Sequence, residues 1–159
     1  MTIRFTLNGE KLEVQTDAES RLVDILRKSF GLLGTKTGCC IGNCGQCSVI
    51  FNGDVVKSCL IPAFKISGSE IGTIEGFSQS DEYQDIVLGF AETEIENCGL
   101  CNTGKILTVE ALLRSNKRPS KDEILPAFNG IACRCTEPEE LVLGIQAAAE
   151  HRRRRIHGR

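Results

Sequence analysis

Apolar and polar residues alternate at the start of the chain, which is the pattern of a half-buried β-strand. Over residues 2–7 every second side chain is apolar, and Asn8-Gly9 follows, a dipeptide typical of a two-residue hairpin turn. The alternation resumes with Leu12 and Val14. We therefore predict that the chain opens with an antiparallel hairpin.

A helical period replaces the alternation over residues 22–26, where apolar side chains recur on one side. Ser20 precedes this run and is a candidate N-cap, and Gly31 lies just past its end. The pattern predicts one short amphipathic helix after the first hairpin.

A second β-rich stretch follows the helix. Residues 48–51 and 55–59 are predicted to form two strands around another Asn-Gly turn, Asn52-Gly53, and residues 71–74 a last short strand. Hairpin, helix, loop, hairpin and closing strand is the element order of the β-grasp fold, a small mixed sheet packed on one helix.

After residue 77 only helical patterns remain. Helical periods lie over residues 86–90 and 106–113, and capping boxes at 120–123 and 136–139 each predict the start of a further helix, with Thr136 as the N-cap of the last. We predict an α+β chain of two domains. The first is a β-grasp domain at residues 1–77, and the second is a helical bundle with a basic C-terminal tail at residues 78–159.

Composition restricts the classes of protein to which the chain can belong. Its 159 residues are 41% hydrophobic but only 5% aromatic, so the core is mainly aliphatic and modest if divided between two domains. Small domains of this kind are often stabilised by bound metal. The formal net charge of −2 argues against a nucleic-acid binder, and no apolar run approaches the ~20 residues that span a membrane.

Neither end of the chain suggests export or nucleic-acid recognition. No secretory signal is visible at the N-terminus, so we expect a cytoplasmic protein in a reducing compartment, where thiols stay free or bind metal. The basic tail at 151–155 is interpreted as the solvated end of a helix, whose dipole favours cations. Docking of this tail to an acidic patch on a partner subunit is the alternative.

Nine cysteines dominate the candidate chemistry, and eight of them fall into two sets of four. The first quartet is C-x4-C-x2-C with a fourth cysteine after eleven further residues; it comprises Cys39, Cys44, Cys47 and Cys59. This is the spacing of plant-type [2Fe–2S] ferredoxins, and Gly38, Gly42 and Gly45 allow the loop to wrap around a cluster. Zinc is the alternative, but it favours paired C-x2-C knuckles. The odd number of cysteines argues against a disulfide scaffold.

The second quartet has a different spacing, C-x2-C and then C-x-C; it comprises Cys98, Cys101, Cys133 and Cys135. The first pair opens one predicted helix and the second pair precedes another. Both pairs are therefore expected to converge where two helix N-termini meet. Spacing alone leaves iron–sulfur and zinc open here. Cys40, the ninth cysteine, is expected to be an unligated neighbour of Cys39.

Taken together, these motifs resemble those of the iron–sulfur subunits of molybdenum hydroxylases. That group includes xanthine dehydrogenase, carbon monoxide dehydrogenase, nicotinate dehydrogenase and 4-hydroxybenzoyl-CoA reductase. The segments that carry the resemblance are GTKTGC at 34–39, GNCGQC at 42–47, SCL at 58–60, CGLC at 98–101 and CRCT at 133–136. The resemblance covers nearly the whole chain and favours iron–sulfur for both quartets.

The resemblance implies an electron-transfer subunit of an oxidoreductase with two [2Fe–2S] clusters. In that family the helical-bundle cluster lies beside molybdopterin and the β-grasp cluster faces a flavin. The second quartet would therefore receive electrons from a molybdopterin-binding large subunit, and the first would pass them to an FAD-binding medium subunit in a hetero-oligomer. The substrate, an N-heterocycle or aldehyde with xanthine as the leading candidate, would react on another chain. No catalytic residue is assigned to this one.

The chain departs from the family pattern beside the second quartet. Asn97 stands where the family usually has a glutamine that approaches the pterin, and it is a candidate molybdopterin contact. Asn102-Thr103 and Glu137-Pro138 also replace the usual residues. Two other functions stay open, a free-standing two-cluster electron carrier and a zinc-stabilised interaction module. Against the carrier, such a protein needs only the first domain.

Overall fold

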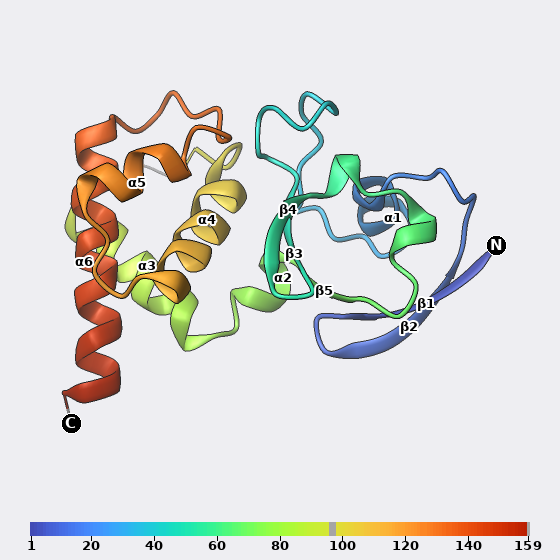
Figure 1. Cartoon of the computed structure of the whole chain (residues 1–159), viewed down its shortest axis with the longest axis horizontal. Helices are drawn as coiled ribbons and strands as arrows, with labels where there is room; N and C mark the ends of the chain where they lie inside the picture. The colour runs from blue at the N-terminus through green and yellow to red at the C-terminus, as the bar shows by residue number, and fades with distance from the viewer. Residues whose placement is uncertain (96–97, 159) are drawn as a thin grey trace.

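The structure of the chain is a computed structural model that describes residues 1–95 and 98–158. It consists of a β-rich half and a helical half that lie side by side (Figure 1). The predicted α+β fold class is confirmed, with a five-stranded sheet followed by helices. The helix α2 (Ile74–Phe77) connects the two halves, and the exact domain boundary at residue 77 stays a prediction.

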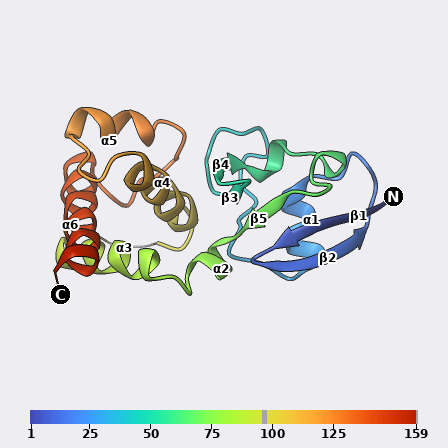
Figure 2. The same cartoon turned by 60° about the horizontal axis from the view of Figure 1, so that its bottom comes forward.

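The sheet has the strand order β2-β1-β5-β3-β4, with β1 and β5 parallel and the other neighbours antiparallel. Helix α1 (Leu22–Lys28) covers one face of it (Figure 2). Ile3, Phe5 and Leu7 of β1 pack with Leu22 and Leu26 of α1 in the core of this half. The strands are β1 (Thr2–Leu7), β2 (Glu10–Gln15), β3 (Ser48–Phe51), β4 (Asp54–Lys57) and β5 (Glu70–Gly72).

Both predicted Asn-Gly hairpins are confirmed. Asn8 and Gly9 have φ angles of 50° and 87°, and Asn52 and Gly53 have 51° and 94°. Left-handed φ at both central positions is the geometry of the tight turns that join twisted antiparallel strands. The dipeptides therefore fix the registers of β1 with β2 and of β3 with β4.

The prediction that Ser20 caps α1 is wrong. The N-cap is Arg21, and it makes no side-chain capping bond. The backbone carbonyl of Ser20 instead accepts a hydrogen bond from Ala63 N at 2.8 Å, and Leu22 N donates to Ile61 O at 2.8 Å. Pairing with the segment around Pro62 thus holds this part of the chain extended up to the first turn of α1.

The predicted strand over residues 55–59 ends early. β4 stops at Lys57, and the following residues form the 3-10 helix η1 (Ser58–Leu60), so Cys59 lies on a helical turn and not on a strand. Ser58 causes the break, because its hydroxyl donates to Cys47 O at 2.7 Å and its N–H to the same oxygen at 3.1 Å. A second 3-10 helix, η2 (Ala63–Lys65), follows.

Four longer helices build the second half. They are α3 (Asp81–Glu92), α4 (Asn102–Ser115), α5 (Lys121–Ala127) and α6 (Pro138–His157). Gly89 lets α3 approach α6 closely, because a Cβ at that position would lie within 3 Å of the Ala148 backbone. All four helices contribute to one aliphatic core around Ile86, Phe90 and Ile145. Within residues 1–95 and 98–158, none of the helices combines the length and the apolar character needed to cross a bilayer.

One of the two predicted capping boxes is confirmed. Ser120 and Glu123 form it at the start of α5. At α6 the prediction of Thr136 as N-cap is wrong, because Glu137 is the N-cap and forms a capping box with Glu140. The hydroxyl of Thr136 instead accepts a hydrogen bond from Lys105 Nζ at 2.9 Å.

The basic tail is not simply a solvated helix end. Arg152 is only 9% exposed, and its Nη2 lies 2.6 Å from Glu110 Oε2. Arg155 Nη2 lies 2.8 Å from Asp85 Oδ2 on α3. These pairs hold α6 against α3 and α4, so the interpretation of the tail as solvated is wrong for Arg152 and Arg155.

Candidate metal centres

Three cysteines of the first quartet lie on a loop, residues 38–47, that joins α1 to the sheet, and the fourth, Cys59, lies on η1. The Sγ of Cys39 accepts hydrogen bonds from the N–H groups of Asn43 at 3.2 Å and Cys44 at 3.3 Å, and the Sγ of Cys44 accepts one from Cys39 N at 3.4 Å. Gly42 and Gly45 have φ angles of 78° and 73°. The backbone therefore wraps inward and aims amide groups at sulfur, as a bound anionic cluster requires.

Gly38 contributes to the wrapping by its small size. A Cβ at this position would lie 2.8 Å from Cys44 Sγ, so a larger residue would displace that thiol. Cys40 also adopts a left-handed φ of 56°, which the sequence did not indicate. Three glycines and one strained cysteine thus shape a loop that brings Cys39 and Cys44 together.

The thiols of the first quartet lie in two different environments. Hydrogen bonds from the backbone N–H groups of Ile41, Cys44 and Asn43 lower the pKa of Cys39 from 9.0 to about 6. Burial, together with the contact with Cys47, raises the pKa of Cys59 to about 11. Cys47 and Cys59 pack together against Val23 of α1. The structure therefore places Cys39 beside Cys44 and Cys47 beside Cys59, and the charge of Cys39 acts on the Cys59 thiol; three of the four cysteines are buried.

The second quartet also comes together, as the sequence predicts. The Sγ atoms of Cys98, Cys101 and Cys135 all lie within 4.8 Å of one another. Cys98 Sγ is 3.8 Å and Cys135 Sγ is 3.7 Å from Cys101 Sγ, while Cys133 Sγ lies 3.5 Å from Cys135 Sγ. Cys101 is the N-cap of α4, and Cys133 and Cys135 lie on the loop before α6. Two helix N-termini therefore meet at this site.

The ionisation of the second quartet depends on its burial and on one nearby cation. Burial raises the pKa of Cys101 above its usual range, hydrogen bonds with Cys133 and Cys135 raise it further, and the charge of Lys105 opposes the rise. Burial also acts to raise the pKa of Cys133, but hydrogen bonds from the Cys135 backbone and from the Cys101 and Cys135 thiols, with the charge of Lys105, lower it overall. Several thiolates at this spacing need positive charge between them, which a metal centre supplies.

The residues present fit a thiolate-ligated metal centre at both places. Metal–sulfur bonds of about 2.3 Å in a tetrahedral site place two sulfurs about 3.8 Å apart, close to the spacings in the second quartet. Soft thiolate ligands select zinc or iron–sulfur over hard oxygen-seeking ions. At the first quartet the inward-pointing amides favour iron–sulfur, because such hydrogen bonds stabilise cluster sulfur.

Comparisons with known proteins separate these two metals. Residues 5–71 match the family of 2Fe-2S iron-sulfur cluster binding domains, and residues 73–146 match the [2Fe-2S] binding domain family. The chain is 40% identical to the nicotinate dehydrogenase small FeS subunit of Eubacterium barkeri, over 94% of this chain and 96% of that one. It is 37% identical to a probable xanthine dehydrogenase subunit of Bacillus subtilis, over 98% of this chain and 87% of that one.

A solved structure agrees with these relatives. The quinoline 2-oxidoreductase of Pseudomonas putida 86 contains a chain that superposes with a TM-score of 0.85 at 36% identity, covering 96% of both chains. This chain belongs to the family of iron–sulfur small subunits of the molybdenum hydroxylases. Both quartets fall inside the matched domains, and the β-grasp and helical halves correspond to the two family matches.

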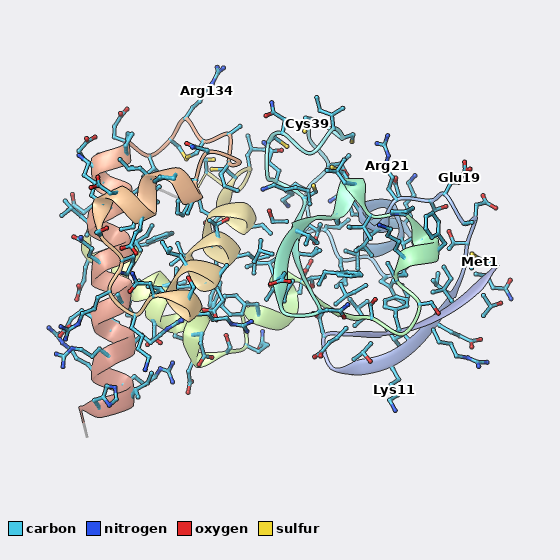
Figure 3. All side chains as sticks on the ribbon, viewed as in Figure 1. Met1, Lys11, Glu19, Arg21, Cys39 and Arg134 are labelled. Carbon is cyan, nitrogen blue, oxygen red and sulfur yellow. The ribbon has the colours of Figure 1, made fainter. Side chains whose placement is uncertain are left out.

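The two halves of this iron–sulfur protein touch through their cysteine loops. Ala132 N, next to Cys133, donates to Cys44 O at 2.9 Å. The backbones of Gly45 and Gly104 approach so closely that a Cβ on Gly104 would lie 2.5 Å from Gly45 O. Thr103 Oγ1 donates to Gly34 O at 2.7 Å and Lys57 Nζ to Gly130 O at 3.0 Å. The loops that carry the quartets therefore form part of the interface between the halves (Figure 3).

Sequence reasoning missed one residue of the site and named one that cannot be placed. The missed residue is Lys105, which is fully buried beside the second quartet. Its position next to the apolar residues Ile106 and Leu107 of α4 was the sequence signal that could have indicated a buried lysine. Asn97, the candidate molybdopterin contact, lies outside the described residues and stays a prediction.

Proposed function

We propose that this chain is the electron-transfer subunit of a molybdenum hydroxylase. It binds one [2Fe–2S] cluster at each quartet and relays electrons from molybdopterin on a large subunit to FAD on a medium subunit. The observation that carries the proposal is the presence of two all-cysteine sites on touching loops, in a chain that matches small FeS subunits over nearly its full length. The ligands are Cys39, Cys44, Cys47 and Cys59 for one cluster and Cys98, Cys101, Cys133 and Cys135 for the other.

Each cluster, when bound, accepts and releases one electron. The chain's own residues hold the thiolates, bury four of the eight and stabilise their negative charge. At the first quartet the amides of Asn43 and Cys44 do this at Cys39 Sγ. At the second quartet the buried side of α4 covers Cys101 at its N-terminus, Cys133 and Cys135 are half-buried, and Cys98 is exposed. In this proposal the substrate reacts on the large subunit, and this chain only transfers electrons.

The contact between the two loops supports the relay. Cys133 follows Ala132, whose N–H donates to the carbonyl of Cys44. A short run of backbone and one hydrogen bond therefore connect Cys44, a ligand of the first site, to Cys133, a ligand of the second. Exposed apolar side chains flank both sites, with Ile41 73% exposed beside the first and Leu100 62% exposed beside the second. Such residues are suited to docking against other chains, because they would bury apolar area there.

The substrate of the complex is proposed from the named relatives. These are a nicotinate dehydrogenase, a probable xanthine dehydrogenase and a quinoline 2-oxidoreductase. Each name contains a nitrogen heterocycle, so we propose that the large subunit oxidises an N-heterocycle.

Purification of the chain from its native source tests the assignment. We expect a stable complex with a molybdopterin-binding and an FAD-binding chain, containing iron and acid-labile sulfide. Within that complex, Cys44→Ser should remove one of two EPR signals and block flavin reduction, while turnover with an artificial acceptor at the molybdenum site continues. Unimpaired flavin reduction would refute the relay order, a persistent monomer would favour the free-standing carrier, and a colourless zinc protein would favour the interaction module.

A further inference from the structure

A buried lysine lies against the second quartet. Lys105, on the first turn of α4, is 0% exposed, and its Nζ lies 4.0 Å from Cys135 Sγ. The same ammonium donates to Thr136 Oγ1 at 2.9 Å and lies 5.9 Å from the centre of the Phe90 ring. These contacts hold the cation in one position beside the sulfurs.

Burial of a lysine ammonium is unfavourable unless negative charge compensates for the lost hydration. Among the described residues, the thiolates of the second quartet supply negative charge next to this ammonium. The charge of Lys105 acts on the thiols of both Cys101 and Cys133. A [2Fe–2S] cluster with four thiolates carries a charge of about −2 when oxidised and about −3 after one electron is added, with no proton required. A fixed cation therefore stabilises the reduced form more than the oxidised form.

We propose that Lys105 is a positioning residue of the second site, whose ammonium lies against the Cys135 ligand and raises the midpoint reduction potential of the cluster bound there. This makes the second site a better acceptor for electrons that arrive from molybdopterin. The proposal rests on the proposed function, since it requires a cluster at the second quartet.

A second cation provides a matched contrast. Arg134 lies between Cys133 and Cys135 in the sequence, but it is exposed and points away from the body of the protein (Figure 3). Water and salt screen a charge in that position, whereas they screen a buried charge much less. If proximity along the chain were sufficient, Arg134 would change the reduction potential of the second cluster as strongly as Lys105. If burial of the charge is required, only Lys105 will change this potential.

The expected effect is large enough to measure. The added electron resides on iron beyond the ligand sulfur, so its distance from the ammonium is roughly twice the 4.0 Å that separates Lys105 Nζ from Cys135 Sγ. At that range and an effective dielectric constant of about 20, a unit charge should change the equilibrium constant for reduction by roughly tenfold to a hundredfold. For a one-electron couple a factor of ten is 59 mV, so the shift is about 60 to 120 mV. Removing the charge should lower the potential of the second cluster by this amount.

The test is an EPR-monitored redox titration of the intact complex, which reports each cluster separately. Lys105→Met removes the charge and keeps the length of the side chain. Lys105→Gln also removes it but keeps a donor for Thr136, and it serves if the methionine variant loses its cluster. Lys105→Arg keeps the charge, and a cavity of about 320 Å³ lined by Lys105, Cys133 and Thr136 gives it room. Arg134→Gln is the control for an exposed charge.

We expect Lys105→Met and Lys105→Gln to lower the potential of the second cluster, Lys105→Arg to restore it, and Arg134→Gln to leave it nearly unchanged. The potential of the first cluster should stay constant in all four variants. An unchanged second-cluster potential in the two neutral variants would overturn the proposal, and so would an equal shift in the potentials of both clusters. The proposal would also be overturned if both neutral variants lost the second cluster and Lys105→Arg lost it equally. A wild-type complex with no cluster at the second quartet would instead refute the proposed function.

Discussion

The contact between Gly45 and Gly104 can be tested by adding a single methyl group. In Gly104→Ala the new Cβ would lie 2.5 Å from Gly45 O and 3.0 Å from Ile131 Cδ1. The closer neighbour is backbone, so it cannot rotate away as a flexible side chain would. Gly45 cannot move away from Gly104, because its own backbone is tightly packed on Gly130: a Cβ built on Gly45 would lie 2.5 Å from Gly130 O. The methyl group must therefore push the first cysteine loop away from α4.

Two opposing effects set the size of the change. Alanine is favoured over glycine by about 1 kcal/mol in a helix interior and by less in the first turn, where Gly104 lies, so without the contact the variant would be slightly more stable. Overpacking at a tight contact costs about 1–3 kcal/mol. Because the clash is with backbone, we expect the upper part of that range and a net loss of about 1–2 kcal/mol. For a chain of this length that corresponds to a melting temperature lower by about 2–8 °C.

Thermal unfolding and EPR of the fully reduced complex measure the two consequences. Gly104→Ala should lower the melting temperature and also weaken the magnetic interaction between the two clusters, because their loops move apart. Gly89→Ala is the matched control, since its Cβ would clash with Ala148 N in the contact between α3 and α6. That variant should lose comparable stability with an unchanged magnetic interaction. A Gly104→Ala protein that is more stable than wild type, with an unaltered interaction, would refute the reasoning.

Three further predictions concern single side chains. Cys133→Ser should destabilise the helical half, because the loop before α6 loses its metal anchor to the N-terminus of α4; an unchanged calorimetric melting profile would contradict this. Arg152→Met should lower the free energy of unfolding, measured by chemical denaturation, by about 2–4 kcal/mol, because Glu110 and Asp85 lose a buried partner. Arg114 and Arg155 remain beside these two carboxylates and limit the loss. The control is Arg153→Met, whose wild-type arginine pairs with the exposed Glu150, and it should change stability by less than about 1 kcal/mol. Equal losses in the two arginine variants would be inconsistent with the burial argument. In metal-free protein, alkylation of Cys39 followed by mass spectrometry should be half-maximal near pH 6, and Cys59 should resist until about pH 11. Since the Cys39 pKa is lowered from 9.0, its contribution to stability is complete above pH 9 and is lost as the pH falls through about 6; identical alkylation profiles for the two thiols would rule this out.

Local signals in the sequence predicted local structure well. Asn8-Gly9 and Asn52-Gly53 specify their turns through backbone preferences of the two residues themselves, and Ser120 with Glu123 caps a helix through bonds three residues apart. These features require no information from the rest of the chain. Cysteine spacing likewise predicted that Cys39 lies beside Cys44 and Cys133 beside Cys135, because a short loop keeps such thiols together, whereas the meeting of Cys101 and Cys135 depends on tertiary packing.

Predictions failed where a distant segment competed for the same group. Ser20 does not cap α1 because its carbonyl pairs with Ala63, and Thr136 does not cap α6 because its hydroxyl accepts from Lys105. Arg152 looked like part of a solvated tail until α3 and α4 supplied its carboxylate partners. The contact between Ala132 and Cys44, which joins the two sites, also depends on how the halves pack, and no spacing rule contains that information.

The central claim is that eight thiolates of this one chain hold two [2Fe–2S] clusters. Iron and acid-labile sulfide analysis combined with EPR spin counting of the reduced complex tests it most directly. The account predicts about four iron and four sulfide per chain, and two distinct signals of about one spin each, of which Cys44→Ser removes one and Cys133→Ser the other. Zinc in place of iron, or a single signal that survives both substitutions, would contradict it.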